Sequence, residues 1–143
     1  MRDARRNIAH LALAEMERRR QVELLITQIV DRLHQHAGSD NVVDLHGRVD
    51  QVRCLGCGTI DTRSNIQDRL GDENNLPEQI SQTPRPDGDM EVPESLISTL
   101  IPPTCKSCNG NLMPNVVFFG GSVPRKTIQR CMSALENADA LLV

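Results

Sequence analysis

The sequence predicts an α/β fold: a partial doubly wound (Rossmann-like) parallel sheet with an inserted small four-cysteine zinc-binding module. Two features predict it. Short apolar, strand-like runs alternate with amphipathic helical segments, and two Cys-x-x-Cys pairs interrupt that alternation. The chain has 143 residues, of which 38% are apolar and 24% charged, as in an ordinary folded domain. This composition excludes collagen-like and wholly disordered chains.

The N-terminal part of the alternation contains one helix and two strands. A helix of about three turns is predicted from Ile8, because one arc of the helical wheel collects Ile8, Leu11, Ala12 and Met16. Residues 22–27 form a leucine-rich and β-branched run, which is typical of a strand buried on both faces. A loop at 38–41 leads to a second strand at 42–46, which Gly47 ends.

The C-terminal part returns to the same pattern. Residues 116–119 are predicted as a strand and the glycine pair 120–121 as a turn. A helix with a buried face is expected next, from the i, i+3, i+4, i+7 spacing of Ile128, Cys131, Met132 and Leu135. Residues 140–143 are predicted to begin another strand. Sheets of this class bind ligands at the carboxyl ends of their strands, where we expect Asp31 and His46.

Residues 59–104 have a different composition from the rest of the chain. Six prolines and an acidic cluster at 87–91 indicate a long, mostly irregular insertion. One helix is expected inside it, with Ser64-x-x-Gln67 as a capping box and Gly71 as its end. A loop of this length fits a compact domain only if its two ends are held together.

The predicted division of the chain is an α/β segment at 1–46, a zinc-binding module at 47–110 and a return to the α/β segment at 111–143.

Two pairs of cysteines can hold the ends of this insertion together. Cys54 and Cys57 form one pair and Cys105 and Cys108 the other, with 47 residues between the pairs. Two such pairs complete the four-sulfur shell of a structural zinc ion, which leaves no position open for a catalytic water. Two unrelated pairs, or a redox-active Cys-x-x-Cys, are the alternatives that the spacing leaves open. Cys131 lies on the predicted apolar helix face and is interpreted as a buried hydrophobic residue.

Charge and composition indicate which classes of binding partner and which cellular compartment to expect. The formal net charge is -3 and the aromatic residues are two Phe without Trp or Tyr, which argues against nucleic acid as a partner. No stretch approaches the ~18 apolar residues of a membrane span, and an apolar signal-peptide core is absent, so a cytoplasmic protein is predicted. The basic segment 1–6 raises the mitochondrial matrix as the alternative, against which Asp3 and Glu15 count.

Several motifs in this order resemble the sirtuins, the NAD-dependent protein deacylases. The matching segments are residues 26–39, Asp44-Leu45-His46-Gly47, both cysteine pairs, 114–120, Val123-Pro124 and 138–143, and the acidic insertion resembles the class II branch. The resemblance implies a Rossmann-like sheet, one structural Zn²⁺ ion, NAD as co-substrate and an acylated protein or peptide as substrate. The implied activity is a transferase-type reaction, in which a lysine acyl group passes to ADP-ribose.

The resemblance also implies roles for individual residues. His46 matches the catalytic base, which accepts a proton from a ribose hydroxyl after the acyl-lysine carbonyl oxygen has attacked the ribose carbon that carried nicotinamide. Residues that match the ribose and nicotinamide pocket are Gln28 and Asp31. The strand and loop that pair with the substrate peptide are matched by Val117, Phe119 and Gly120. From its position alone, His46 is a strand-end residue with a satisfied hydrogen bond, and the other histidines are surface or structural residues: His10, His34 and His36.

The chain departs from the family pattern at three places. Ile29 stands where the family motif Thr-Gln-Asn has its Asn, and Gly121 replaces the acidic residue after Phe-Gly. The only Gly-x-Gly is Gly56-x-Gly58, so the chain holds no glycine-rich phosphate loop. We expect the family's Gly-Ala-Gly turn to precede the first residue and its Gly-(Thr/Ser)-Ser turn to follow the last. The expectation is weak NAD binding by this truncated chain, and the alternative function is a non-catalytic zinc-clamped protein-binding fragment.

Overall fold

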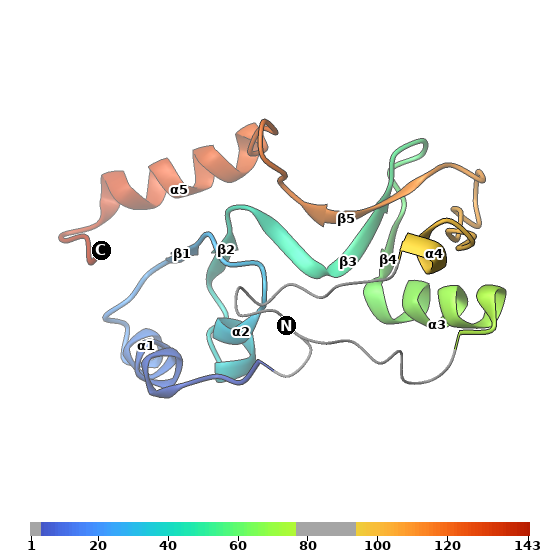
Figure 1. The fold of residues 1–143 in the computed structure, drawn as a ribbon. Helices are drawn as coiled ribbons and strands as arrows, with labels where there is room; N and C mark the ends of the chain where they lie inside the picture. The colour runs from blue at the N-terminus through green and yellow to red at the C-terminus, as the bar shows by residue number, and fades with distance from the viewer. Residues whose placement is uncertain (1–3, 77–93) are drawn as a thin grey trace. The chain divides into compact units, whose positions relative to one another are not determined.

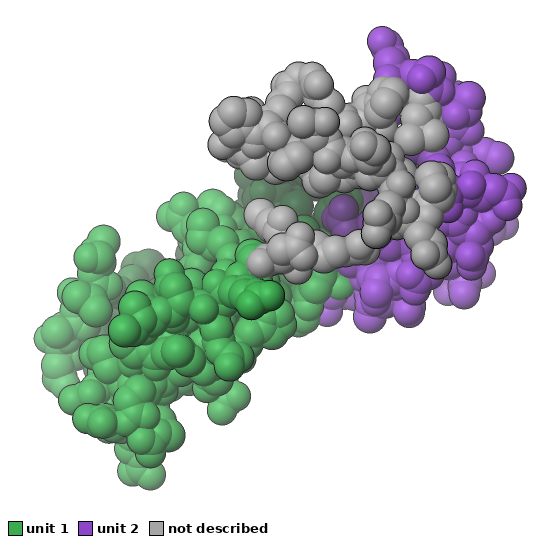
Figure 2. All heavy atoms as spheres, turned by 60° about the horizontal axis from the view of Figure 1, so that its bottom comes forward, with its two compact units in different colours: residues 1–50, 114–143 green, residues 51–113 purple. Residues whose placement is uncertain are grey.

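The computed structural model describes residues 4–76 and 94–143 and divides the chain into two compact units (Figures 1 and 2). Unit 1 comprises residues 1–50 and 114–143, and unit 2 comprises residues 51–113. Unit 1 is therefore built from both ends of the sequence. The functional division at 1–46, 47–110 and 111–143 stays a prediction, because compactness alone does not show which segments act together.

Unit 1 contains the parallel strand pair that the alternating pattern predicts. β1 (Leu25–Thr27) pairs in parallel with β2 (Val42–Asp44). Both strands lie inside the predicted runs but are shorter than them. The core of the pair consists of Leu25, Val42 and Val43, all buried. Ile26 is 38% exposed, so β1 is buried on one face only and the expectation of a strand buried on both faces is wrong.

Two helices belong to the first segment of unit 1. α1 (Ile8–Arg18) begins where predicted, because the side-chain oxygen of Asn7 accepts hydrogen bonds from the backbone N–H groups of Ala9 and His10. α2 (Leu33–Ala37) lies between β1 and β2 and ends at Gly38, whose φ of 106° is left-handed. α2 is not among the predicted elements; with it, the observed order is helix, strand, helix, strand, as in the α/β class.

A pair of histidines joins α1 to α2. The ring centroids of His10 and His34 lie 4.6 Å apart. His34 Nδ1 is buried, and none of the described residues gives it a hydrogen-bond partner. The contact fits the interpretation of both residues as structural histidines. Their spacing in the sequence does not indicate the contact, since only the packing of α1 on α2 brings the rings together.

We predict that unit 1 loses stability as the pH falls below about 6.5. Burial, and then the proximity of His10, lower the pKa of His34, while Asp31 and Asp44 oppose this shift. A histidine with a lowered pKa in the folded chain favours folding above its unfolded pKa, and this contribution is lost as the pH falls through the folded pKa. Urea unfolding at pH values of about 7.5 and about 5.5 measures the loss.

The matched pair of variants for this prediction is His34→Gln and His36→Gln. His36 lies on the same helix and is exposed, so its replacement should leave the pH dependence unchanged. His34→Gln should reduce the difference in unfolding free energy between the two pH values. An undiminished difference in His34→Gln would contradict the assignment.

An ion pair holds the turn before α2 to the end of β2. Arg32 has a φ of 68°, a left-handed conformation that is uncommon for residues other than glycine. Its guanidinium donates to Asp44 Oδ2, and Gln35 Nε2 donates to Asp44 Oδ1 at 3.0 Å. The Arg32 and Asp44 side chains are only 18% and 12% exposed, so solvent screens this pair weakly.

Arg32→Ala is expected to destabilise unit 1 by about 1–3 kcal/mol, because it leaves the partly buried Asp44 carboxylate without its cation. Denaturant unfolding measures the change. Arg19→Ala removes an ion pair to Glu15 on the exposed face of α1 and should change stability little. Equal losses in the two variants would show that Arg32 acts no differently from a surface charge.

A three-stranded sheet has the order β4–β3–β5, formed by β3 (Gly47–Cys54), β4 (Ile60–Thr62) and β5 (Leu112–Val116). β3 and β4 are antiparallel. β3 is not among the predicted elements; its residues include four charged or polar side chains, Arg48, Asp50, Gln51 and Arg53. The strand predicted at 116–119 is wrong, since β5 starts four residues earlier. Pairing with β3, and not local apolarity, sets the limits of β5.

The helix expected in the insertion is present with different ends. α3 (Arg63–Asn74) is capped by the Thr62 hydroxyl, which accepts from the Asn65 N–H at 3.2 Å, so the predicted cap at Ser64 is wrong by two residues. The helix continues through Gly71, and Asn75 ends it in the left-handed conformation at φ 48°. A single short helix, α4 (Glu94–Ile97), follows within the described part of the insertion. The acidic cluster at 87–91 lies outside the described residues.

α5 (Arg125–Asn137) confirms the predicted C-terminal helix. Cys131 is buried as expected, at 7% exposed. The rest of the predicted buried face is between 38% and 50% exposed, so that expectation is wrong for Ile128, Met132 and Leu135. Residues 140–143 form no strand, because no described segment pairs with them. Among the described residues, none of the helices combines the length and apolar character needed to cross a bilayer.

Candidate metal centre and strand-end site

Two turns of unit 2 bring the predicted metal ligands together. The first turn follows β3 and is closed by a hydrogen bond of 3.0 Å from the Gly58 N–H to the Cys54 carbonyl. The second precedes β5 and is closed at 2.8 Å by the Asn109 N–H and the Cys105 carbonyl. Gly58 and Asn109 have φ values of 76° and 56°, which glycine and asparagine adopt most readily. The turns carry the four ligands Cys54, Cys57, Cys105 and Cys108.

The four sulfur atoms have the spacing of a tetrahedral zinc site. All lie within 4.8 Å of one another, with 3.5 Å between the Sγ atoms of Cys54 and Cys108 and 3.6 Å between those of Cys57 and Cys105. Zn–S bonds of about 2.3 Å place the sulfur atoms of a tetrahedron about 3.8 Å apart. The thiols are free and form no disulfide. This geometry fits one structural zinc ion and argues against two unrelated cysteine pairs.

The backbone around the cluster donates hydrogen bonds to one of the sulfur atoms and leaves space beside two of them. The N–H groups of Gly56 and Cys57 point to Cys54 Sγ at 3.3 and 3.5 Å and stabilise a thiolate there. A Cβ atom on Gly110 would lie 3.0 Å from Cys54 Sγ and 3.1 Å from Cys108 Sγ. A Cβ atom on Gly56 would lie 3.4 Å from Cys108 Sγ, which is an ordinary van der Waals distance. The close approach to the sulfur atoms therefore favours glycine at position 110, in the second turn.

The thiols influence one another's ionisation. The Thr59 hydroxyl, 3.1 Å from Cys57 Sγ, and then the Thr59 backbone lower the pKa of Cys57 to about 6. The Gly110 backbone lowers the pKa of Cys108, but the neighbouring Cys54 and Cys57 thiols outweigh it and raise that pKa to about 12. Four thiolates cannot ionise side by side without a cation between them. A divalent ion removes this conflict, because a coordinated thiol is deprotonated.

The carboxyl ends of the two parallel strands meet in unit 1. The Leu45 N–H donates to the Thr27 carbonyl at 2.8 Å, and the His46 carbonyl accepts from the Val117 N–H at 2.8 Å. Gly47 turns the chain at φ 84°, where a Cβ would lie 2.3 Å from the Asn115 carbonyl oxygen. The backbone on both sides of His46 is thus fixed. The imidazole of His46 is half-buried, and no described residue forms a hydrogen bond or ion pair with it. This differs from the interpretation of His46 as a strand-end residue whose side chain has a satisfied hydrogen bond.

The residues matched to the cofactor pocket follow β1. Gln28 is exposed, and Asp31 Oδ1 accepts from the Leu33 N–H at 3.0 Å at the start of α2. Asp31 therefore has a structural bond of its own. Ile29 is 57% exposed, so its hydrocarbon side chain does not fill a pocket in this unit. The assignment of Gln28 and Asp31 to NAD binding stays a prediction.

The residues matched to the peptide-binding strand lie just beyond β5. Val117 is bonded through its N–H to the His46 carbonyl. Phe119 is fully exposed, and Gly120 has a φ of 80° in a turn that the Gly121 N–H closes on the Phe118 carbonyl at 2.8 Å. The predicted turn at 120–121 is thus confirmed. The role of these residues in peptide binding stays a prediction.

Sequence reasoning missed the ion pair between Arg32 and Asp44, which lies beside this strand end. Asp44 is the last residue of β2, two positions before His46. The left-handed conformation of Arg32, which directs its guanidinium to Asp44, has no marker in the sequence, because glycine or asparagine is the usual residue there.

Fold and site together define a Rossmann-like α/β protein with a four-cysteine structural metal centre. The model of the Sir2 family matches residues 1–143, and the chain therefore belongs to the Sir2 family, the sirtuins. Rossmann-like sheet, zinc module and family agree with the sequence-based predictions.

The relatives and solved structures agree with this assignment. The chain is 46% identical over 148 residues to NAD-dependent protein deacylase SIR4 of Monosiga brevicollis, covering 100% of this chain and 48% of that protein. It is 46% identical over 140 residues to an NAD-dependent protein deacetylase of Xanthomonas campestris, covering 98% and 48%. A structure of Sir2 with a p53 peptide and NAD+ superposes with a TM-score of 0.69 at 30% identity, covering 94% and 45%. The chain spans about half the length of the relatives it matches.

Replacing Cys108 by Ser is expected to abolish stoichiometric zinc binding, because three thiolates and a hydroxyl no longer close the tetrahedral shell. The wild-type chain should carry about one zinc per molecule, and its removal by a chelator should unfold unit 2, since zinc binding in such small modules is coupled to folding. Metal analysis and circular dichroism measure the two effects. Cys131→Ala, outside the cluster, is the control and should keep its zinc. Full zinc occupancy in Cys108→Ser would contradict the proposed ligand set.

Proposed function

We propose that this chain provides the zinc module, the histidine base and part of the substrate-binding face of an NAD-dependent protein lysine deacylase. The observation that carries the proposal is His46: its backbone is held between two parallel strand ends and Val117, while its imidazole has no partner among the described residues. Membership in the Sir2 family supports it, as do relatives that are themselves NAD-dependent deacylases and deacetylases.

In this proposal the imidazole of His46 acts as the general base. It accepts a proton from a ribose hydroxyl, which frees that oxygen to take the acyl group from the lysine. Bound NAD supplies the ADP-ribose unit to which the acyl group is transferred. A general base needs a fixed position and an open approach, and the hydrogen bond from the Val117 N–H to the His46 carbonyl provides the first of these.

The cofactor-binding part of the proposal rests on the segment after β1. Gln28 is exposed beside the carboxyl end of β1 and can offer its amide to ribose hydroxyls, and one carboxylate oxygen of Asp31 already accepts from the Leu33 N–H. The chain holds no glycine-rich loop for a pyrophosphate, since its only Gly-x-Gly belongs to the cysteine turn. These residues fit the ribose end of NAD and leave its phosphates without a cradle in this chain.

The peptide-binding part rests on the segment after β5. An acylated peptide is proposed to add as an extended strand beside Val117, Phe119 and Gly120, so that backbone hydrogen bonds give affinity and the lysine side chain reaches toward His46. The full exposure of Phe119 leaves its ring open to such a peptide. It equally supports the alternative function, a non-catalytic, zinc-clamped fragment that captures a protein.

The compartment is also a proposal. We infer a cytoplasmic protein, with the mitochondrial matrix as the alternative, because its five cysteines are free, as is usual in a reducing compartment. A fluorescent fusion to the C-terminus distinguishes the two.

His46→Ala separates the catalytic proposal from the binding alternative. The variant is expected to keep one zinc and to bind an acetyl-lysine peptide as the wild type does, while any formation of deacylated peptide in the presence of NAD falls by about 100-fold or more, because the base that acts after nicotinamide has left is gone. Zinc analysis, fluorescence polarisation and a peptide deacylation assay measure the three properties. His36→Ala, on the exposed side of α2, is the control and should change none of them.

The same assays expose the proposal to failure. Calorimetric titration of the wild-type chain with NAD should show binding weaker than micromolar, for want of a phosphate loop. If formation of deacylated peptide is equal in His46→Ala and the wild type, His46 is not the base. If peptide capture is strong but no deacylated peptide forms at any NAD concentration, the non-catalytic function is favoured.

A further inference from the structure

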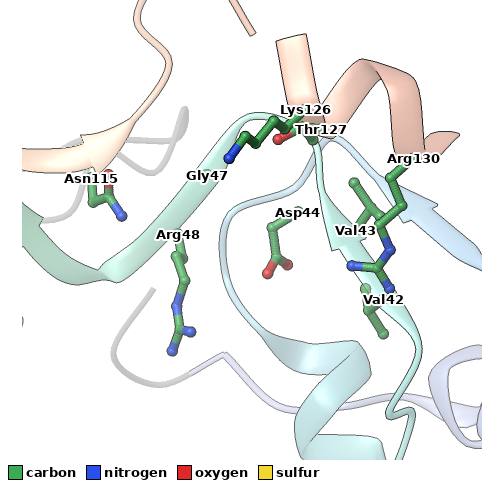
Figure 3. A pocket seen from close by; sticks show the side chains of 9 residues that line it. All are labelled: Val42, Val43, Asp44, Gly47, Arg48, Asn115, Lys126, Thr127 and Arg130. Atoms are coloured by element: carbon green, nitrogen blue, oxygen red, sulfur yellow. The ribbon is translucent and has the colours of Figure 1, made fainter. Parts of the chain in front are cut away.

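Unit 1 contains an open hollow of about 430 Å³ that His46 and the other residues matched to the sirtuin site do not line (Figure 3). Its walls come from β2, the start of β3, β5 and α5. Figure 3 shows that Lys126 and Arg130 both extend from α5 over this space, toward Gly47 and toward β2 respectively. The volume is in the range of pockets that take small organic ligands.

The hollow is locally basic in a chain whose formal net charge is -3. Three cationic side chains line it, from Arg48, Lys126 and Arg130, against a single carboxylate, that of Asp44. Asp44 is already held by the Arg32 guanidinium and by Gln35, so its charge is compensated from outside the hollow.

The two cations on α5 are the ones available to a ligand. Arg48 is paired with Asp50, at 2.8 and 2.6 Å. In the part of the chain that the structure describes, Lys126 and Arg130 form no ion pair with a carboxylate. Arg130 donates from Nη2 to Asn41 Oδ1, which fixes its guanidinium and leaves its other N–H groups available.

The spacing of these groups suits a doubly charged anion. Lys126 and Arg130 stand four residues apart on α5 and therefore lie on the same side of the helix. Thr127, between them, adds a hydroxyl to the lining. A phosphate monoester carries about two negative charges at neutral pH and three acceptor oxygens, whereas a carboxylate carries one charge and two oxygens. The Lys126 ammonium, the Arg130 guanidinium and the Thr127 hydroxyl therefore match a phosphate monoester better than a carboxylate.

Two apolar side chains belong to the lining of the hollow. Val42 and Val43 line it and are 9% and 4% exposed. Gly47 offers no side chain, since a Cβ there would collide with the Asn115 carbonyl oxygen at 2.3 Å. A ligand with a flat organic part next to its phosphate would cover the two valines while its phosphate meets α5.

We propose that this hollow binds a small organic phosphate monoester of about the size of a nucleoside monophosphate, with the phosphate between Lys126 and Arg130 and the organic part against Val42 and Val43. The inference does not depend on the proposed deacylase function. Polymeric nucleic acid is a poorer candidate, because the chain as a whole is acidic and the hollow is a local feature.

The test is a titration of the isotope-labelled, zinc-loaded chain, followed by nuclear magnetic resonance, with three probes: adenosine monophosphate, adenosine and inorganic phosphate. Adenosine monophosphate should give saturable shifts at the amides of Val43, Gly47 and Lys126. Adenosine should bind at least about tenfold more weakly, because it lacks the charged hydrogen-bonding group. Inorganic phosphate should also bind more weakly than adenosine monophosphate, since it does not cover the valines.

Two variants and a matched control assign the site. Lys126→Ala and Arg130→Gln should each weaken the binding of adenosine monophosphate by about tenfold. Arg125→Ala removes the same charge from the neighbouring position of α5, which is exposed and does not line the hollow, and should change binding less than about twofold.

Four results would overturn the proposal. Equal weakening in Arg125→Ala and Lys126→Ala would mean a general charge effect. Equal affinity for inorganic phosphate and adenosine monophosphate would mean an adventitious ion only. Shifts confined to residues 25–31 would mean that the ligand binds outside the hollow. Tighter binding of a DNA oligonucleotide than of the mononucleotide would mean that the ligand is polymeric nucleic acid. None of these results bears on the His46 assays, so the two proposals fail separately.

Discussion

The interaction on which unit 2 depends is the convergence of four sulfur atoms on one point. In residues 51–76 and 94–113 of this unit, buried apolar side chains are few, and α3 has no buried residue. Four thiols within 4.8 Å of one another would repel as thiolates. The same arrangement becomes strongly favourable once a divalent ion sits among them, because binding and folding are then one process. Hydrogen bonds from backbone N–H groups to Cys54 Sγ stabilise this arrangement, and Gly110, which has no side chain, leaves room for it.

Unit 1 is held together by polar contacts at the ends of its strands. Its two parallel strands are only three residues long each, too short for a large core, and polar contacts reinforce their ends. The Arg32–Asp44 pair ties the turn after β1 to the end of β2, and the Val117 N–H ties the C-terminal segment to His46. Both contacts anchor the strand end that carries the candidate base.

The metal centre could be predicted from the sequence because its information is local. Two residues between cysteines suffice to make a chelating turn, wherever the turn is carried. The helix from Ile8 could be predicted for the same reason, since Asn7 caps it and its apolar residues recur at helical spacing. By contrast, β3 could not be predicted. Its sequence lacks a regular alternation of polar and apolar residues, since Asp50 and Gln51 stand between Val49 and Val52. The strand is defined by its pairing with β4 and β5, and β5 is distant in the sequence. The shift of β5 from 116–119 to 112–116 has the same cause.

By itself, the amino-acid sequence determined the ligand set of the metal site, the alternation of helices and strands and the kinship with the sirtuins, because each of these is carried by residue type at short spacing. Only the tertiary structure decided which residues meet over long separations. It brought His10 to His34, Arg32 to Asp44, and the basic side of α5 over β2. Such contacts depend on backbone conformations and packing that a chain adopts as a whole, and one-dimensional spacing contains no measure of them.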